Sequence, residues 1–191
     1  MRSRPCSAQP REIRPVLHQS QDTDWAYAAG LVDGEGCIAI VRSFMPSRQR
    51  YQYGVHVVIA NRDREVFDWM HSIWGGWVVA VSRRQERARP AWNWRCQTGI
   101  SARPFLIGIQ PWLRIKGPQC INALAMIDLM TRSRGTLGPY PMPLEWLEEQ
   151  ESLYWIQRKL NHRGNNDFVK QPMHSPRRIN RERELAATIG L

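Results

Sequence analysis

The sequence has little cysteine and no long apolar run. Its four cysteines, Cys6, Cys37, Cys96 and Cys120, include no pair with the Cys-x-x-Cys spacing of a zinc site. No stretch approaches the roughly 20 apolar residues that span a bilayer, and residues 1–15 lack the apolar segment of a signal peptide. We therefore expect no zinc, no membrane partner and no secretion. The expected location is the cytoplasm, or an organellar matrix if the gene is organellar.

Positive charge is abundant, and arginine carries nearly all of it. The chain has 27 basic and 17 acidic residues, a net charge of +10, and only three of the basic residues are lysines. Residues 36–98 hold ten arginines and four acids within a region rich in strand-forming residues. Charge spread along strands favours a surface that follows a nucleic-acid backbone. An anionic membrane surface is the alternative polyanion.

Composition divides the chain into four parts. Residues 1–22 are expected to form a disordered leader, because the segment is punctuated by proline and shows no periodicity. Residues 23–131 are expected to form the main domain. Residues 132–161 are expected to form a linker and a C-terminal helix, and residues 162–191 a basic, disordered tail.

Hydrophobic periodicity predicts a helix, two strands, a helix, two strands and further helices. For example, Tyr53, Val55, Val57 and Ile59 alternate with other residues along one strand. The predicted elements lie at 25–32, 37–44, 52–60, 63–74, 77–83, 92–97, 104–109, 118–130 and 144–160. The short connections predict a mixed α+β domain with an antiparallel sheet. The tryptophans of the strands are expected to lie in the core.

The segment 27–38, YAAGLVDGEGCI, joins a helix of small and apolar residues to an acid-x-acid-Gly run and then to a strand. On the helix, Ala26, Ala29, Gly30 and Asp33 share a face on which a second helix could approach closely. Glu35 lies between two glycines, so a metal ion and a phosphate have room to approach it. Two chains packed along this face would bring two Glu35 carboxylates together, and such a pair can hold Mg²⁺.

This segment resembles the motif of the LAGLIDADG homing endonucleases, with Ala28 in place of the usual leucine and Glu35 as the second acid. The resemblance implies an αββαββα core with a saddle-shaped antiparallel sheet. It also implies a single-motif, homodimeric enzyme that cuts double-stranded DNA at a long, partly palindromic site and has no small-molecule substrate. Glu35 and Gly34 are then the metal-binding residues for Mg²⁺, which Mn²⁺ or Ca²⁺ would replace in binding. Ala26, Ala29, Gly30 and Asp33 are then the dimer interface.

Two more residues are expected near the site. The segment 110–119 is similar to a late segment of the family that carries a basic residue beside the active site, and Lys116 matches it. Lys116 is the only lysine before Lys159, and a compact ammonium suits a phosphate or a metal-bound water. Asn61 matches an amide that positions water in the family. An ordinary turn residue at a strand end is the alternative for Asn61, and we favour it slightly.

The DNA-binding surface is expected on the polar sides of the strands and in their turns, because arginine, glutamine and asparagine pair with base edges and phosphates. The predicted contacts are Arg48, Arg50, Gln52, His56, Arg83, Arg84, Asn93, Arg95 and Gln97.

Two other functions stay open on the same fold: an RNA-binding intron maturase and a DNA-binding regulator that does not cut. The presence of Glu35 and Lys116 counts against the regulator. Maturases of the family can retain the acids, so these residues do not separate a maturase from a nuclease.

Overall fold

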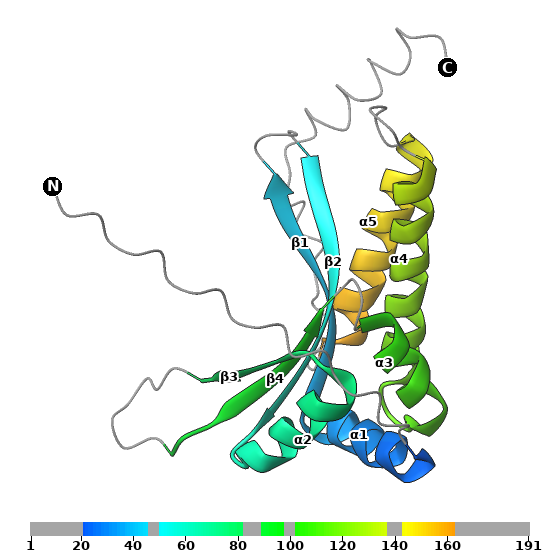
Figure 1. Cartoon of the computed structure of the whole chain (residues 1–191). Coiled ribbons are helices and arrows are strands. Elements are labelled where there is room, and N and C mark those ends of the chain that lie inside the picture. Colours follow the sequence, from blue (N-terminus) through cyan, green and yellow to red (C-terminus); the bar gives the residue numbers. More distant parts are fainter. Residues whose placement is uncertain (1–20, 46–49, 82–88, 98–101, 137–142, 163–191) are drawn as a thin grey trace, which may run out of the picture.

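The structure, a computed structural model, describes residues 21–45, 50–81, 89–97, 102–136 and 143–162. Helices and strands follow one another in the predicted order, which confirms the α+β fold class (Figure 1). The elements are α1 (Asp22–Glu35), β1 (Gly36–Met45), β2 (Arg50–Asn61), α2 (Arg64–Trp74), β3 (Trp77–Ala80), β4 (Trp92–Gln97), α3 (Ala102–Ile109), η2 (Gln110–Trp112), α4 (Gly117–Thr136) and α5 (Leu144–Leu160).

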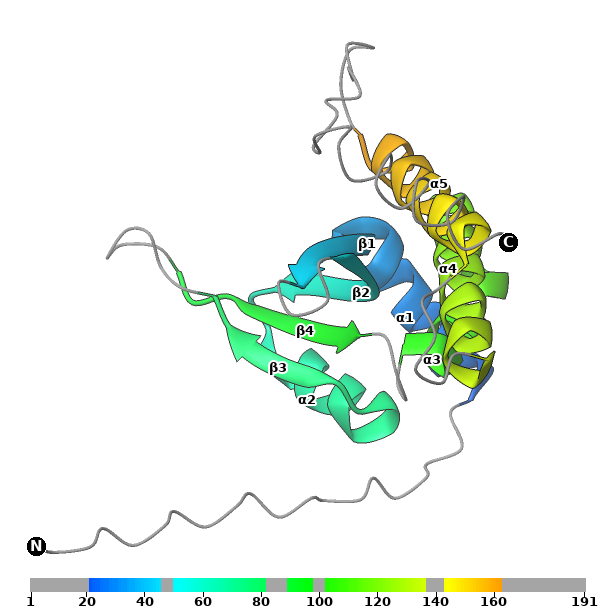
Figure 2. The same cartoon turned by 90° about the horizontal axis from the view of Figure 1, so that it is seen from above.

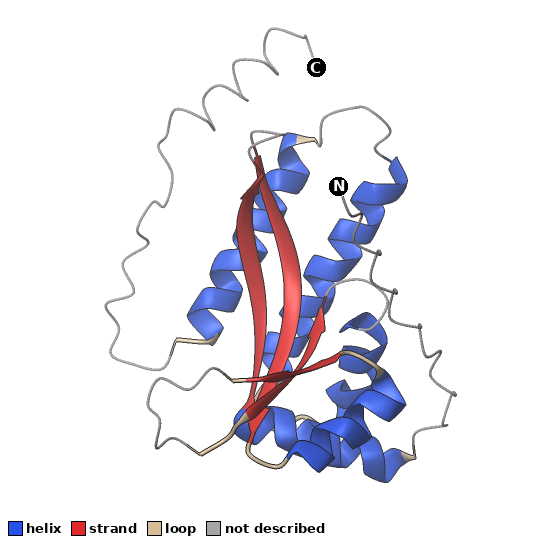
Figure 3. Ribbon diagram, turned by 60° about the vertical axis from the view of Figure 1, so that its left-hand side comes forward, coloured by secondary structure: helices blue, strands red, loops and turns tan. Residues whose placement is uncertain are grey.

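The four strands form one antiparallel sheet in the order β1-β2-β4-β3. Helices α4 and α5 lie along one side of the sheet, and α1 and α2 lie at its lower end (Figures 1 and 2). The long strands β1 and β2 twist past these helices, and β3 and β4 splay away from them (Figure 3). No described helix covers the other side of the sheet, which we call the open face.

Strand alternation fixes the core. The inward side chains of β1, β2 and β4 are buried against the helices, whereas their neighbours along each strand are half-buried or exposed. Trp94 is completely buried, and its indole Nε1 donates a hydrogen bond to the Gly75 carbonyl at 2.9 Å. The buried strand residues are Ile38, Ile40, Tyr53, Val55, Val57, Ile59, Trp94 and Cys96.

The junction between α1 and β1 is tighter than the sequence suggested. Helix α1 continues to Glu35, so Gly34 lies inside the helix and does not end it. A Cβ atom on Gly36 would lie 2.7 Å from the Cα and the carbonyl oxygen of Val32. Glycine is therefore required at position 36, because the first strand starts directly against the last turn of the helix.

The entry to β3 corrects one prediction. Gly75 and Gly76 have φ values of 69° and 84°, which favour glycine, and a Cβ on Gly76 would lie 2.6 Å from the Arg95 carbonyl oxygen. The chain leaves this turn with Trp77 on the open face, where its side chain is 56% exposed. The prediction that the strand tryptophans are core residues is wrong for Trp77, although it is confirmed for Trp94.

The C-terminal helix packs on the same core as the rest of the domain. Helix α4 runs to Thr136, beyond the predicted end at residue 130. Asn122 of α4 donates a hydrogen bond to Gln157 Oε1 at 2.8 Å, and Gln157 Nε2 donates to the Ile38 carbonyl of β1 at 2.6 Å. Gln157 is 1% exposed, and the oxygen and nitrogen of its side-chain amide join α4, α5 and the edge of the sheet inside the protein.

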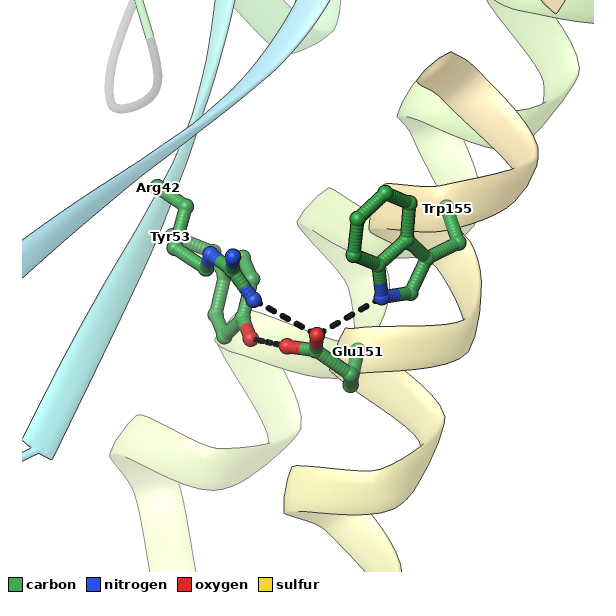
Figure 4. Close-up of polar contacts among 4 residues, drawn as sticks. All are labelled: Arg42, Tyr53, Glu151 and Trp155. Carbon is green, nitrogen blue, oxygen red and sulfur yellow. Dashed lines mark hydrogen bonds and ion pairs between the residues drawn. The ribbon is translucent and has the colours of Figure 1, made fainter. Parts of the chain in front are cut away.

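A charged cluster also joins α5 to the sheet (Figure 4). Arg42 Nη1 donates to Glu151 Oε1 at 2.6 Å, the Tyr53 hydroxyl donates to Glu151 Oε2, and Trp155 Nε1 donates to Oε1 at 2.7 Å. The guanidinium of Arg42 lies 4.6 Å from the ring centre of Tyr154. Desolvation opposes ionisation of Glu151, but the hydrogen bonds from Tyr53 and Arg42 hold its pKa below the usual value.

Candidate active site at the end of the first helix

Glu35 is the last residue of α1, and its side chain is exposed. A Cβ atom on the neighbouring Gly34 would meet nothing within 4 Å, so the space beside Glu35 is open. Gly36 pairs with Ile59 in the sheet. Glu35 therefore lies at the end of the sheet where β1 begins and β2 ends.

The first acid of the motif has a different environment. Asp33 Oδ2 accepts hydrogen bonds from the backbone N–H groups of Arg114 at 2.7 Å and Ile115 at 3.2 Å, and Oδ1 accepts from that of Lys116 at 2.9 Å. The half-buried carboxylate thus fastens residues 113–116 to the end of α1. The expected place of Asp33 at a dimer interface stays a prediction. The contacts that its carboxylate makes within the chain reach residues about eighty positions away, so no local pattern predicts them.

Lys116 is brought to the same place. Its side chain is 6% exposed, and Nζ donates to the carbonyl oxygens of Val32 at 2.7 Å and Asp33 at 2.6 Å. A cation at this position stabilises the C-terminal end of a helix, where backbone carbonyls lack partners. Lys116 therefore donates hydrogen bonds to backbone carbonyls just before Glu35. Its participation in catalysis stays a prediction.

Asn61 lies at the same end of the sheet, two residues beyond Ile59 along β2. Its Oδ1 accepts hydrogen bonds from the N–H groups of Arg62 at 2.6 Å and Asp63 at 3.2 Å. These bonds shape the turn that leads into α2, whose N-cap is Asp63. The turn role matches the alternative that the sequence favoured, and a role in positioning water stays a prediction.

The surface of α1 requires one correction. Ala29 is completely buried in the core of its own chain, so a second copy cannot contact its side chain. The helical period places Ala29 one position away from the exposed face. That face holds Gly30 and Gly34, whose missing Cβ atoms would meet nothing within 4 Å, beside the half-buried Ala26 and the 50% exposed Tyr27.

The open face carries five of the predicted DNA contacts: Gln52, His56, Asn93, Arg95 and Gln97. His56 pairs with Gln97, and Val58 pairs with Arg95, so His56 and Arg95 are diagonal neighbours on this face. Burial and the positive charge of Arg95 lower the pKa of His56. Both effects favour the neutral form of the imidazole.

Four predicted contacts remain. Arg48, Arg83 and Arg84 fall outside the described residues. Arg50 is the first residue of β2, and its side chain also falls outside them.

The described part of a single chain offers few ligands for a metal ion. The described residues contain no group of three or more histidines, cysteines, aspartates and glutamates that could hold a metal ion. At the end of α1, Asp33 is occupied by backbone N–H groups, and Glu35 is the exposed acid. Carboxylate and carbonyl oxygens suit Mg²⁺, so Glu35 and the Gly34 carbonyl fit the ion in kind but not in number.

No protein-family model matches the sequence, and no curated protein matches it. Among solved structures, the chain is similar to the homing endonuclease I-CvuI in complex with the I-CreI target, with a TM-score of 0.61, 18% identity and coverage of 89% of this chain and 97% of that one. The archaeal intron-encoded homing endonuclease I-Vdi141I, complexed with DNA, gives a TM-score of 0.60, 14% identity and coverage of 78% and 90%.

A third similar structure is the I-SmaMI LAGLIDADG homing endonuclease bound to cleaved DNA, with a TM-score of 0.52 and 19% identity. The match covers 78% of this chain but 48% of that one. The chain therefore has the LAGLIDADG homing endonuclease fold, as the motif at residues 27–38 predicted. None of its described helices is long and apolar enough to cross a membrane.

Proposed function

We propose that this protein is a metal-dependent, site-specific DNA endonuclease that acts as a homodimer. The observation that carries the proposal is the position of Glu35. Its exposed carboxylate lies at the end of α1, where a Cβ atom on Gly30 or Gly34 would meet nothing within 4 Å. The open face of the adjacent sheet carries Arg95. The same fold binds DNA in the structures of I-CvuI and I-Vdi141I.

Double-stranded DNA is the proposed partner of the open face. Arg95 makes no ion pair with a described acid, and the chain carries a net charge of +10. Gln52, His56, Asn93 and Gln97 add hydrogen-bonding groups to the same face. A two-dimensional array of such groups can read base edges in a major groove, and the surrounding positive charge favours binding to phosphates.

The homodimer follows from the incomplete metal site. One chain brings one Glu35, and the matched fold spans almost all of I-CvuI but about half of I-SmaMI. The exposed face of α1 has no side chains at Gly30 and Gly34, and Ile115, on the loop that Asp33 holds, is 66% exposed. Two copies packed through these residues would bury the apolar surface and bring their Glu35 carboxylates together.

In this mechanism, each Glu35 carboxylate and Gly34 carbonyl would hold a divalent cation beside a scissile phosphate. When bound, the cation supplies an activated water and neutralises charge on the phosphate. I-CvuI structures were obtained in 2 mM Mg and in 2 mM Ca. Asp33 and Lys116 would fix the end of α1 and thus the position of Glu35. Asp33 accepts hydrogen bonds from the backbone of residues 114–116, and Lys116 donates to the carbonyl oxygens of Val32 and Asp33.

The test is selection of cleaved sites from randomised or host-genome duplex DNA in the presence of Mg²⁺. We expect a long, partly palindromic site, short 3′ overhangs and loss of cutting with a chelator. Duplex binding without cutting would favour a regulator. Specific binding of an intron RNA without DNA cleavage would favour a maturase.

Gly30→Leu tests the dimer directly. A leucine in the middle of the exposed face of α1 would keep two α1 helices apart. We therefore expect sedimentation to show a monomer on the selected site, and we expect loss of double-strand cutting. Ile121→Leu, a conservative change at an exposed position of α4, is the control. A wild-type monomer that cuts both strands would refute the homodimer.

A further inference from the structure

The edge strand β3 presents an apolar surface on the open face. Trp77, Val79 and Val81 are 56%, 43% and 40% exposed, and we call these three residues the apolar strip. They alternate with Val78, which packs against the core. Single exposed hydrophobic residues are common on proteins, but three consecutive outward positions form a continuous patch. An uncovered apolar edge strand also promotes aggregation. We therefore expect a partner to cover the apolar strip.

The apolar strip is continuous with the proposed DNA-reading residues. Trp77 pairs with Arg95, and Val79 pairs with Asn93. The Val81 N–H donates to the Ala91 carbonyl at 2.9 Å, which extends the same register. Trp77 and Val79 therefore stand beside outward residues of β4, and Val81 stands beside Ala91, which precedes that strand. The exposed cation of Arg95 favours an anionic partner beside the strip.

The start of the strip is held firmly. Trp94 Nε1 donates to the Gly75 carbonyl at 2.9 Å, and His71 Nδ1 lies 3.0 Å from the Gly76 carbonyl oxygen. Together with the close approach of Gly76 to the Arg95 carbonyl, these contacts fix the backbone immediately before Trp77. A fixed backbone at this point reduces the conformational entropy that the strip loses when it meets a ligand.

We propose that the apolar strip contacts the 5-methyl groups of thymines in the major groove, next to the bases that Arg95 and Asn93 read. The inference rests on the proposed function, and it names a base, thymine, that the DNA-binding surface recognises. Thymine is the base that presents a methyl group in that groove, and apolar side chains are its natural contacts. Trp77 and Val79 are thus specificity-determining residues that give preference for thymine over cytosine at these positions.

Deoxyuridine substitution tests the proposal, since uracil differs from thymine only by the absent methyl group. The duplex recovered from cleavage-site selection would be resynthesised with deoxyuridine at each thymine in turn, and binding measured in Ca²⁺. We expect at least one thymine in each half-site whose replacement weakens binding about fourfold, equivalent to about 0.8 kcal/mol for one methyl-sized group.

Two variants connect the effect to the strip. Trp77→Ala and Val79→Ser should weaken binding to the thymine duplex and abolish the difference between thymine and uracil at the sensitive positions. Val79→Ser removes both methyl groups at an exposed position, so it serves even if Trp77→Ala disturbs folding. Ile121→Ala, at a 58% exposed residue of α4, should keep the wild-type difference.

Equal binding of thymine and uracil duplexes by the wild-type protein would overturn the inference and leave the proposed function intact. Persistence of the full difference in both strip variants would also overturn it. A change of oligomeric state in the strip variants would assign the strip to a protein interface instead. Failure of the wild-type protein to bind any duplex would refute the proposed function itself, which is a separate result.

Discussion

Arg42 and Arg95 are both strand arginines, but they lie on opposite faces of one sheet. The side chain of Arg42 is 3% exposed, ion-paired with Glu151 and surrounded by the rings of Tyr51, Tyr154 and Trp155. Arg95 is exposed and meets no described acid within ion-pair distance. Arg42 therefore joins α5 to the sheet, whereas Arg95 leaves a positive charge available on the open face.

This difference shows that the face of a strand, not the residue type, determines what a charge can do. On the helix side, a charge needs a partner because desolvation is costly. On the open face, water solvates the charge until a polyanion replaces it. Substitutions on the helix side should therefore reduce stability, and substitutions on the open face and at Glu35 should reduce function without loss of stability.

Glu35→Gln should give the largest functional loss. The amide keeps the size of the side chain but removes the negative charge that would hold the cation, so cleavage in Mg²⁺ should fall at least about a hundredfold. DNA binding and the melting temperature should not decrease, since the side chain is exposed. Single-turnover cleavage and thermal unfolding measure the two quantities. Near-normal cutting would show that Glu35 is not the metal-binding acid.

Glu151→Gln should give the largest loss of stability. It leaves the buried guanidinium of Arg42 without its counter-charge, and we expect about 3 kcal/mol of destabilisation, at the low end for buried pairs because Glu151 is 35% exposed. Urea unfolding measures it. Asp68→Asn, in the exposed pair with Arg64, is the matched control and should cost less than about 1 kcal/mol.

The pH dependence of the same variant checks the cause. Because the folded protein lowers the pKa of Glu151, this carboxylate stabilises the fold above its usual value near 4.5, and the contribution is lost as pH falls through the lower folded-state pKa. Wild-type stability should therefore decline more steeply than that of Glu151→Gln below pH 4.5. Parallel curves would assign the stability to packing rather than to the ion pair.

Much of this arrangement could be predicted from the sequence. Alternation identified the inward residues of β2 and β4, and the motif at 27–38 identified the helix-to-strand junction and its exposed acid. These features are local, because each depends on the period of one element or on a few consecutive residues. The register then brings the predicted His56, Arg95 and Gln97 onto one face.

The contacts that sequence analysis missed join distant parts of the chain. Asp33 bonds to residues 114–116, and Gln157 bonds to Ile38, so neither partner is visible in a local pattern. Sequence analysis places Trp77 in the core together with the other strand tryptophans. Its face was determined by the Gly75-Gly76 turn and the pairing with β4.

Lys116→Met tests whether the contacts at the end of α1 serve stability, cleavage or both. Removal of two hydrogen bonds from a buried ammonium to helix carbonyls should destabilise the protein by about 1–2 kcal/mol, and it should slow cleavage of bound DNA by displacing Glu35. Thermal unfolding and single-turnover cutting measure both. Lys159→Met, at an exposed lysine of α5, should change neither. Slow cleavage with unchanged stability would indicate a direct role in chemistry, and wild-type cutting would leave Arg114 as the next candidate for the positively charged residue near the metal.

The smallest expected effect tests whether the open face works as one electrostatic unit. Burial is the main cause of the lowered pKa of His56, and the charge of Arg95 adds to it. Arg95→Ala should therefore raise the pKa of His56 without restoring it to the usual value near 6.5, and imidazole NMR shifts would follow the titration. Arg103→Ala, on α3, is the control.

DNA should act on His56 in the opposite direction to Arg95. Phosphates favour the imidazolium form, so the complex should take up a proton, and binding should tighten as pH falls from about 6.5 through the free-protein pKa. In the same interval the free protein loses stability, because the unfolded chain binds that proton more readily. His56→Gln should flatten both dependences, each by less than about 1 kcal/mol since the group is only half-buried. If binding by wild type and His56→Gln changed identically with pH, His56 would lie outside the DNA contact, and Arg95 would act on the open face alone.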